Sequence, residues 1–149
     1  MPTAEREGVV THQLDSDAAS VPEARRLALE FAGSVMSDQQ CSHLGVAISE
    51  VVGNAVRHSG SSDDIRLILT RKNGYLCVRV TDGGTGLVPR PGAMASEPGA
   101  GFGLFLVEQL TRRWGVTREE GRTRVWFEID YAEAAQNGDR PSDAPCDPV

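Results

Sequence analysis

The chain has 149 residues, the size of one ordinary domain, and is long enough to bury a core without disulfides or a structural metal. Lys and Arg total 15 against 21 Asp and Glu, and the resulting formal net charge of −6 disfavours direct binding to a nucleic-acid backbone. The sequence has neither a stretch of about eighteen apolar residues nor a basic start followed by an apolar run, so we expect neither a membrane span nor a secretion signal.

The three cysteines, Cys41, Cys77 and Cys146, show no CxxC or CxxH spacing that would indicate a metal site. Cys41 and Cys77 lie in or beside segments with a regular apolar pattern. We therefore expect both to be buried free thiols, which fits a reducing cytoplasmic location.

The two ends of the chain differ in composition from its middle. Residues 1–6 are polar, and residues 132–149 mix Pro, Asp, Gly and Ala with almost no large apolar side chains. Such segments bury too little apolar surface to fold, so we expect a flexible N-terminus, a domain over residues 7–131 and a disordered C-terminal tail.

The first half of the domain predicts one strand and two helices. Gly8–Leu14 fits an edge strand, and Ser20 before Pro22 and Glu23 reads as the N-cap of a helix that ends near Phe31. A second helix is predicted over residues 42–58, where the apolar residues recur at helical spacing. Those residues are Leu44, Ile48, Val51, Val52 and Ala55.

The second half predicts two hairpins with a helix between them. Residues 65–70 and 75–81 alternate apolar and polar side chains around the Asn73-Gly74 turn signal, so they should pair as antiparallel strands. A third helix is predicted over residues 104–113, and residues 115–118 and 123–131 form the second predicted hairpin. This order gives an α+β sandwich with helices on one face of the sheet.

Glu50, Asn54 and His58 follow one another at intervals of four residues, so their side chains form one polar stripe on the predicted second helix. Asn can give a neutral oxygen to Mg²⁺, and Glu can accept a proton from a nucleophile. The alternative is a solvated helix face with contacts between residues four apart. The stripe alone leaves both interpretations open.

Two glycine clusters flank a segment that contains Pro89, Pro91 and Pro98. In the first, Asp82–Gly86, an acid ends a strand where it can accept the adenine amino proton, although an ordinary strand-to-loop turn is the alternative. In the second, Gly99–Gly103, backbone N–H groups and a helix start suit a polyphosphate, although a purely structural loop is again the alternative. Neither the Walker nor the Rossmann spacing occurs.

Taken in order along the chain, these features resemble the GHKL superfamily, which includes gyrase, Hsp90, histidine-kinase catalytic domains and the anti-sigma-factor serine kinases. Residues 48–58 (ISEVVGNAVRH) resemble the N box of that family, residues 82–86 (DGGTG) its G1 box and residues 101–104 (GFGL) its G2 box. Thr123 matches the Thr that helps the Asp to hold adenine.

The resemblance implies a Bergerat-type two-layer sandwich, with a mixed, mostly antiparallel sheet and a lid near residues 87–100 that closes over ATP. It implies that Glu50 is the general base and that Asn54 is the Mg²⁺ ligand. Arg57 matches a cationic phosphate contact, with an exposed helix arginine as the alternative, and His58 is expected to close its helix or pair with an acid. The remaining implied nucleotide contacts are Asp82, Gly84, Gly86, Gly101, Phe102, Gly103, Leu104 and Thr123.

Among members of the superfamily, the chain is most similar to the small bacterial anti-sigma-factor kinases. We expect neither the dimerisation helices of histidine kinases nor the transducer domains of gyrase and Hsp90. The resemblance implies a serine/threonine kinase that phosphorylates an anti-anti-sigma partner in transcription regulation, that also binds a sigma factor, and that forms homodimers. The alternative is an ATP-binding module that sequesters such a partner without kinase activity, but the presence of Glu50 favours an enzyme.

Overall fold

The computed structural model describes residues 8–58, 64–72, 74–82, 102–119 and 122–130, and within them one sheet carries all the strands. The strand order is β1-β2-β3-β5-β4, and every pairing is antiparallel. The strands are β1 (Gly8–Leu14), β2 (Ile65–Arg71), β3 (Tyr75–Asp82), β4 (Arg113–Glu119) and β5 (Arg122–Asp130).

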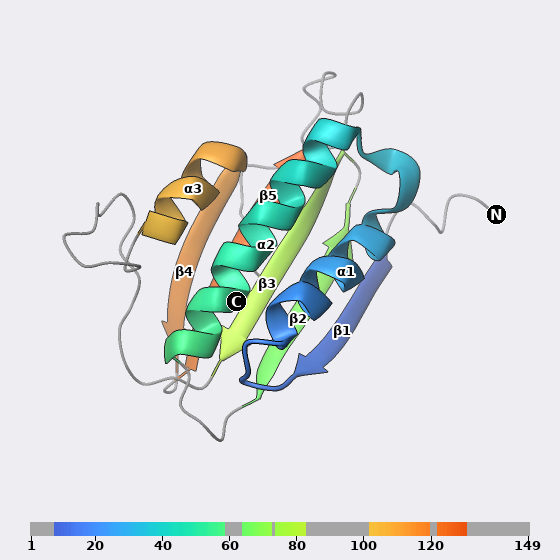
Figure 1. The fold of residues 1–149 in the computed structure, drawn as a ribbon. Helices are drawn as coiled ribbons and strands as arrows, with labels where there is room; N and C mark the ends of the chain where they lie inside the picture. The colour runs from blue at the N-terminus through green and yellow to red at the C-terminus, as the bar shows by residue number, and fades with distance from the viewer. Residues whose placement is uncertain (1–7, 59–63, 73, 83–101, 120–121, 131–149) are drawn as a thin grey trace.

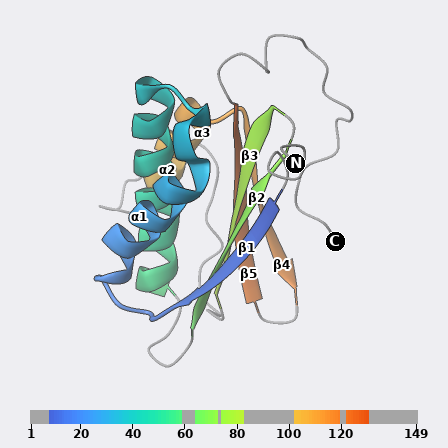
Figure 2. The same ribbon diagram turned by 90° about the vertical axis from the view of Figure 1, so that its right-hand side faces the viewer.

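Helices α1 (Ser20–Ala32), α2 (Asp38–His58) and α3 (Phe102–Leu110) lie on the same side of this sheet, with a 3₁₀ turn, η2 (Gly33–Val35), between α1 and α2 (Figures 1 and 2). The predicted α+β two-layer sandwich is therefore confirmed, as is the edge position of the first strand. Within the described residues no helix is both long enough and apolar enough to cross a membrane.

The core forms where alternate strand residues meet the apolar stripes of the helices, because side chains point to opposite faces of a strand in turn. On β3 and β5 the residues that point toward the helices are all buried: Leu76, Val78, Val80, Val125, Phe127 and Ile129. Helix α2 packs on both of these strands and on α1 and α3. It is thus the central element of the helical layer.

The structure corrects the predicted starts of the first two helices. Ser20 lies inside α1 and does not cap it; its hydroxyl donates to the Asp15 carbonyl at 2.7 Å, while the Asp17 carboxylate accepts from the Ala19 N–H at 2.8 Å. Helix α2 begins one turn earlier than predicted, because Ser37 and Gln40 form a reciprocal capping box. The Ser-x-x-Gln spacing was visible in the sequence.

The predicted third helix over residues 104–113 is wrong at both ends. Helix α3 starts at Phe102 and stops at Leu110, and Arg113 already belongs to β4. The Thr111 hydroxyl donates to the Val107 carbonyl at 2.7 Å, and the Arg112 N–H donates to the Glu128 carbonyl at 2.9 Å. Pairing with β5 therefore replaces the last predicted helical turn.

The two cysteines within the described residues behave differently. Cys41 is free, as expected. Cys77, however, is disulfide-bonded, so the prediction of a free thiol is wrong for this residue. Side chains alternate along β3. Leu76 and Val78 face the core, so Cys77 lies on the opposite face of the sheet.

Candidate nucleotide site

Asp82 and Thr123 lie opposite each other on neighbouring strands, at the end of β3 and near the start of β5. They share the sheet face that carries Val80 and Val125, which is the face covered by the helices. Each is only 5% exposed. Two polar side chains thus interrupt an otherwise apolar surface at one end of the sheet, and directly opposed residues of an antiparallel pair are close enough to act on one ligand.

Two residues of the polar stripe on α2, Glu50 and Asn54, differ in burial. Asn54 is 5% exposed, so the alternative of a solvated helix face does not hold for this residue, whereas Glu50 is partly exposed. The Arg57 guanidinium is on the surface and donates through Nη2 to the Asn54 Oδ1 atom. The structure therefore brings Asn54 and Arg57 together, one turn beyond Glu50.

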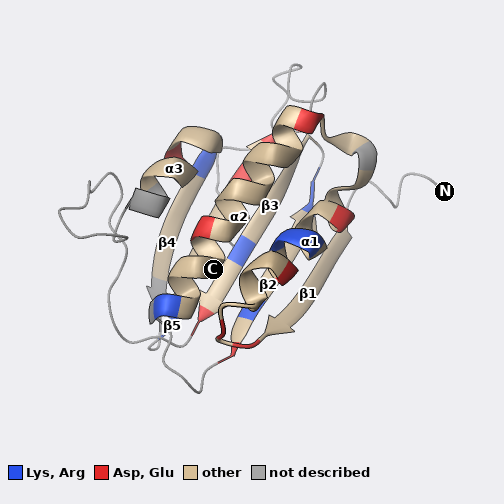
Figure 3. Cartoon of the chain, viewed as in Figure 1, with Lys and Arg blue, Asp and Glu red and all other residues tan. Residues whose placement is uncertain are grey.

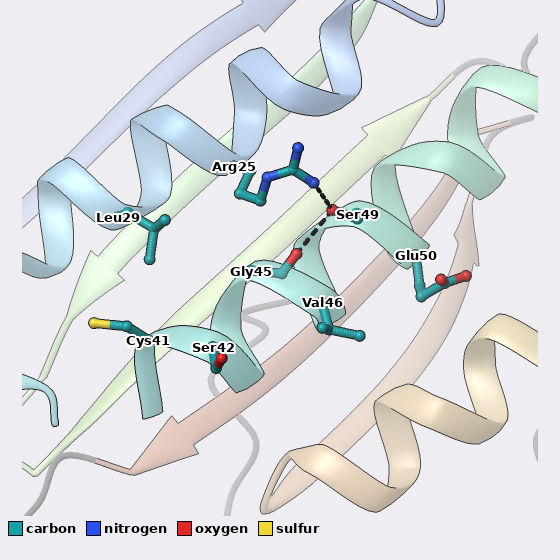
Figure 4. Close-up of a pocket in the computed structure, with 8 residues that line it drawn as sticks. All are labelled: Arg25, Leu29, Cys41, Ser42, Gly45, Val46, Ser49 and Glu50. Carbon is teal, nitrogen blue, oxygen red and sulfur yellow. Dashed lines mark hydrogen bonds between the residues drawn. The ribbon is translucent and has the colours of Figure 1, made fainter. Parts of the chain in front are cut away.

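A groove of about 450 Å³ runs along the solvent side of α1 and α2 and includes Glu50 (Figure 4). Arg25 reaches across from α1 and donates through Nη1 to Ser49 Oγ at 2.6 Å, while Glu50 lies on the other side of α2. Ser49 Oγ in turn donates to the Gly45 carbonyl at 2.8 Å. The residues lining the groove are Arg25, Leu29, Cys41, Ser42, Gly45, Val46, Ser49 and Glu50.

Sequence reasoning missed Arg25 and Ser49 as part of this surface. For Arg25 the sequence spacing contained a signal. Arg25 follows Ala24 and precedes Ala28 by three residues, and because both alanines are buried, Arg25 lies at the edge of the buried stripe of α1. Gly45 completes the arrangement: a Cβ at this position would lie 3.3 Å from Arg25 Cδ. The glycine lets the arginine cross closely over α2.

Asn54 fits a metal ion that is shared with a nucleotide better than an all-protein metal site. Within the described part of the chain, no group of three His, Cys, Asp or Glu side chains could hold a metal. Mg²⁺ commonly takes one or two protein oxygens and fills its other positions with water and substrate phosphates. The Asn54 Oδ1 atom already attracts a cation, since it accepts from Arg57.

Several residues implied by the resemblance are not described. Gly84, Gly86, Gly101 and the expected lid lie outside the described residues. Phe102, Gly103 and Leu104 form the first turn of α3, and their side chains, like that of His58 at the end of α2, are likewise not described. Because α3 starts at Phe102, Gly103 lies inside the helix, whereas Gly99 and Gly101, which were predicted to precede it, lie outside the described residues.

Charge is mixed on the helix side of the molecule. Figure 3 shows Asp and Glu interspersed with Lys and Arg along the helices, and no described helix in that view carries a long uninterrupted run of Lys and Arg. A long basic surface would be the electrostatic signature of a phosphate backbone. The charges in this view therefore add nothing in favour of nucleic-acid binding.

A model of the histidine kinase-like ATPase domain matches residues 14–129. No curated protein matched the chain. The chain belongs to the histidine kinase-like ATPase family, which forms part of the GHKL superfamily.

Solved structures share the fold at low sequence identity. The RsbU and RsbW domains of Rv1364c from Mycobacterium tuberculosis superpose with a TM-score of 0.63 at 19% identity, over 83% of this chain and 32% of that one. The histidine kinase domain of the blue-light activated kinase EL346 from Erythrobacter litoralis gives 0.53 at 23%, over 80% and 63%. The catalytic domain of histidine kinase ThkA gives 0.54 at 13%, over 82% and 98%.

At these identities the structures establish the fold alone. The chain spans about a third of the mycobacterial structure, so the activity of that whole protein does not transfer with the fold. What the family does imply is an ATP-binding domain of the ATPase or kinase type.

Proposed function

We propose that this protein binds Mg·ATP and transfers the γ-phosphoryl group to a serine or threonine of a partner protein of the anti-anti-sigma class. In this proposal Asp82 and Thr123 bind adenine, Asn54 binds the metal and Glu50 is the general base. The remaining nucleotide contacts are proposed for Arg57, Gly84, Gly86, Gly101, Phe102, Gly103 and Leu104. The process served would be bacterial transcription regulation in the cytoplasm, with a sigma factor as a second partner and a homodimer as the assembly.

The observation that carries the proposal is the buried pair formed by Asp82 and Thr123 on the helix face of the sheet. Two polar side chains in a close-packed apolar layer cost free energy unless a partner satisfies them, and both take part in polar interactions here. A carboxylate that accepts and a hydroxyl that can donate or accept suit the polar edge of a purine ring. Helix α2, which supplies Asn54 and Glu50, packs across the same strands.

A role of Glu50 in proton transfer is supported by its partly exposed position at the groove along the solvent side of α1 and α2. In the proposed step the carboxylate takes the proton from the partner's hydroxyl, the hydroxyl oxygen forms a bond to the γ-phosphorus, and the bond from that phosphorus to the bridging oxygen breaks, leaving ADP. When bound, Mg²⁺ would neutralise charge on the phosphate oxygens.

The fold is shared with a structure that contains an RsbW domain and with histidine kinase domains, so the fold alone does not choose between a serine or threonine and a histidine as phospho-acceptor. The choice between a kinase and a sequestering module therefore depends on chemistry at Glu50.

The test is the Glu50→Gln variant in single-turnover assays with purified anti-anti-sigma-like proteins. A general base contributes about a hundredfold to ten-thousandfold in rate, so the variant should bind ATP like the parent and lose at least about a hundredfold in phosphotransfer. Glu30→Gln, an exposed glutamate on α1, is the matched control and should retain activity. A parent that binds ATP and the partner tightly but forms no phosphopartner would establish the sequestering module instead.

A further inference from the structure

The side-chain oxygen that we propose as the metal ligand is already occupied by a cation from the protein itself. Arg57 Nη2 donates to Asn54 Oδ1, three residues earlier on α2. Asn54 is 5% exposed, and Arg57 is exposed. A guanidinium therefore reaches from the surface to a buried amide oxygen.

The local sequence permits this arrangement. Long side chains on a helix turn back toward its N-terminus, which brings the Arg57 guanidinium over the preceding turn. Residue 53 in that turn is glycine, and a Cβ there would lie 3.6 Å from Arg57 Nη1. The guanidinium thus passes near residue 53, where a Cβ would make only an ordinary van der Waals contact with Nη1, and it donates to Asn54 through Nη2.

We infer that Arg57 holds the cation position at Asn54 in the nucleotide-free protein, and that Mg²⁺ binding requires Arg57 to leave. An amide oxygen has two lone pairs, but two positive charges at the same poorly exposed oxygen repel each other strongly because little water screens them. Occupancy by Arg57 and by the metal is therefore exclusive. Through this contact with Asn54, Arg57 sets how strongly Mg²⁺ and nucleotide binding are coupled.

This inference rests on the proposed Mg·nucleotide site, and thermodynamic linkage gives it a readout that does not depend on activity. Calorimetry would measure ADP affinity in EDTA and in saturating Mg²⁺, and the ratio of the two dissociation constants is the coupling. In the parent, breaking the contact between Arg57 and Asn54 costs free energy, and this cost lowers the ratio. Arg57→Ala should therefore raise the ratio, by about threefold to tenfold for a partly exposed charge-assisted hydrogen bond.

The controls separate this effect from other roles of Arg57. Arg26→Ala removes an exposed helical arginine from α1 and should leave the ratio at the parent value. Arg57→Lys keeps the charge but not the planar fork, so its ratio should lie between those of the parent and Arg57→Ala. If Arg57 served only as a phosphate contact, Arg57→Ala would weaken ADP binding equally with and without Mg²⁺, the ratio would not change, and the inference would be overturned.

A second measurement reads the contact directly. The side-chain amide signals of Asn54 in the NMR spectrum of the nucleotide-free protein should differ between the parent and Arg57→Ala, and should converge when Mg·ADP is added. Spectra that are identical before addition would overturn the inference. If the parent showed no Mg²⁺-dependent ADP binding at all, the proposed function would fall together with it, whereas an unchanged ratio in a coupled parent overturns the inference alone.

Discussion

Both faces of the sheet bury polar side chains, but we expect the polar side chains of the two faces to have different roles. On the face toward the helices, Asp82 and Thr123 interrupt an apolar layer at one end of β3 and β5. On the outer face, opposite the helices, Glu128 is completely buried and pairs with Arg112 at 2.5 Å and with Arg113 at 3.8 Å.

The outer-face cluster forms a connected set of charges. The Arg112 Nε atom lies 3.3 Å from Asp130 Oδ1, and the Arg112 guanidinium carbon lies 5.7 Å from the centre of the Tyr75 ring. The same arginine donates its backbone N–H to the Glu128 carbonyl, so the cluster joins the end of α3 to β5. The buried Glu128 carboxylate is thus bonded within the fold, and we expect this cluster to contribute to stability and not to nucleotide affinity.

The largest expected effect on stability comes from Glu128→Ala. Removing one member of a buried ion pair weakens the compensation of its partners, but Arg112 keeps its contact with Asp130, is about a quarter exposed and can turn toward water. We therefore expect a loss of about 2–4 kcal/mol in the free energy of unfolding, near the lower part of the range for broken buried pairs, with ATP affinity unchanged.

Urea denaturation followed by circular dichroism checks this value, with Glu30→Gln as the control. Glu30 pairs with Arg26 in an exposed contact, so its loss should cost less than about 1 kcal/mol. Equal destabilisation by the two variants would contradict a structural role for the outer-face cluster.

The contrast between the two faces also shows which features could be predicted from the sequence alone. Period-two alternation predicted that β3 and β5 are strands, and the Asn-Gly signal predicted that β2 is the hairpin partner of β3, because these are local properties. The opposition of Asp82 and Thr123, forty-one residues apart, came only with the family resemblance, since no local pattern sets the register between β3 and β5.

Other details depend on tertiary contacts that no local pattern contains. Helical spacing placed Asn54 on a polar stripe but did not predict its burial, which follows from the packing of α2 on the sheet and on α3. The early end of α3 follows from the bond between Arg112 N–H and the Glu128 carbonyl, sixteen residues apart. In both places a distant strand or helix decides the outcome.

Asp82→Ala tests the face toward the helices and should give the opposite result to Glu128→Ala. Loss of a hydrogen bond to a charged group costs about 1.5–3 kcal/mol, which is about tenfold to more than a hundredfold in ATP affinity. We expect a fold that unfolds at or above the parent's urea midpoint, because sites kept for ligands are seldom optimal for stability. Calorimetry showing equal ATP affinity for variant and parent would exclude adenine recognition by Asp82.

Gly115→Ala tests the outer face of the sheet and should have a smaller effect on stability than Glu128→Ala. A Cβ at residue 115 would lie 2.7–2.8 Å from the Trp126 ring, which is 8% exposed and packs flat over this glycine. The ring has to shift, and such overpacking costs about 1–3 kcal/mol. Thermal unfolding should record the loss while calorimetry finds normal ATP binding; a weakened nucleotide affinity would show that the two faces are coupled.

Thr123→Val gives the smallest expected effect and the sharpest test of the face toward the helices. Valine keeps the β-branched shape that suits the strand and removes only the hydroxyl, so packing beside Val125 should survive. Because the lost bond joins neutral groups, ATP affinity should fall by about 0.5–1.5 kcal/mol, or about twofold to tenfold. Asp82 and Thr123 act on one ligand in this proposal, so the double variant should lose less affinity than the sum of the two single losses. Additive losses would mean that the two residues bind the nucleotide independently, or that Thr123 does not bind it at all, and the pair would then have to be assigned to separate roles.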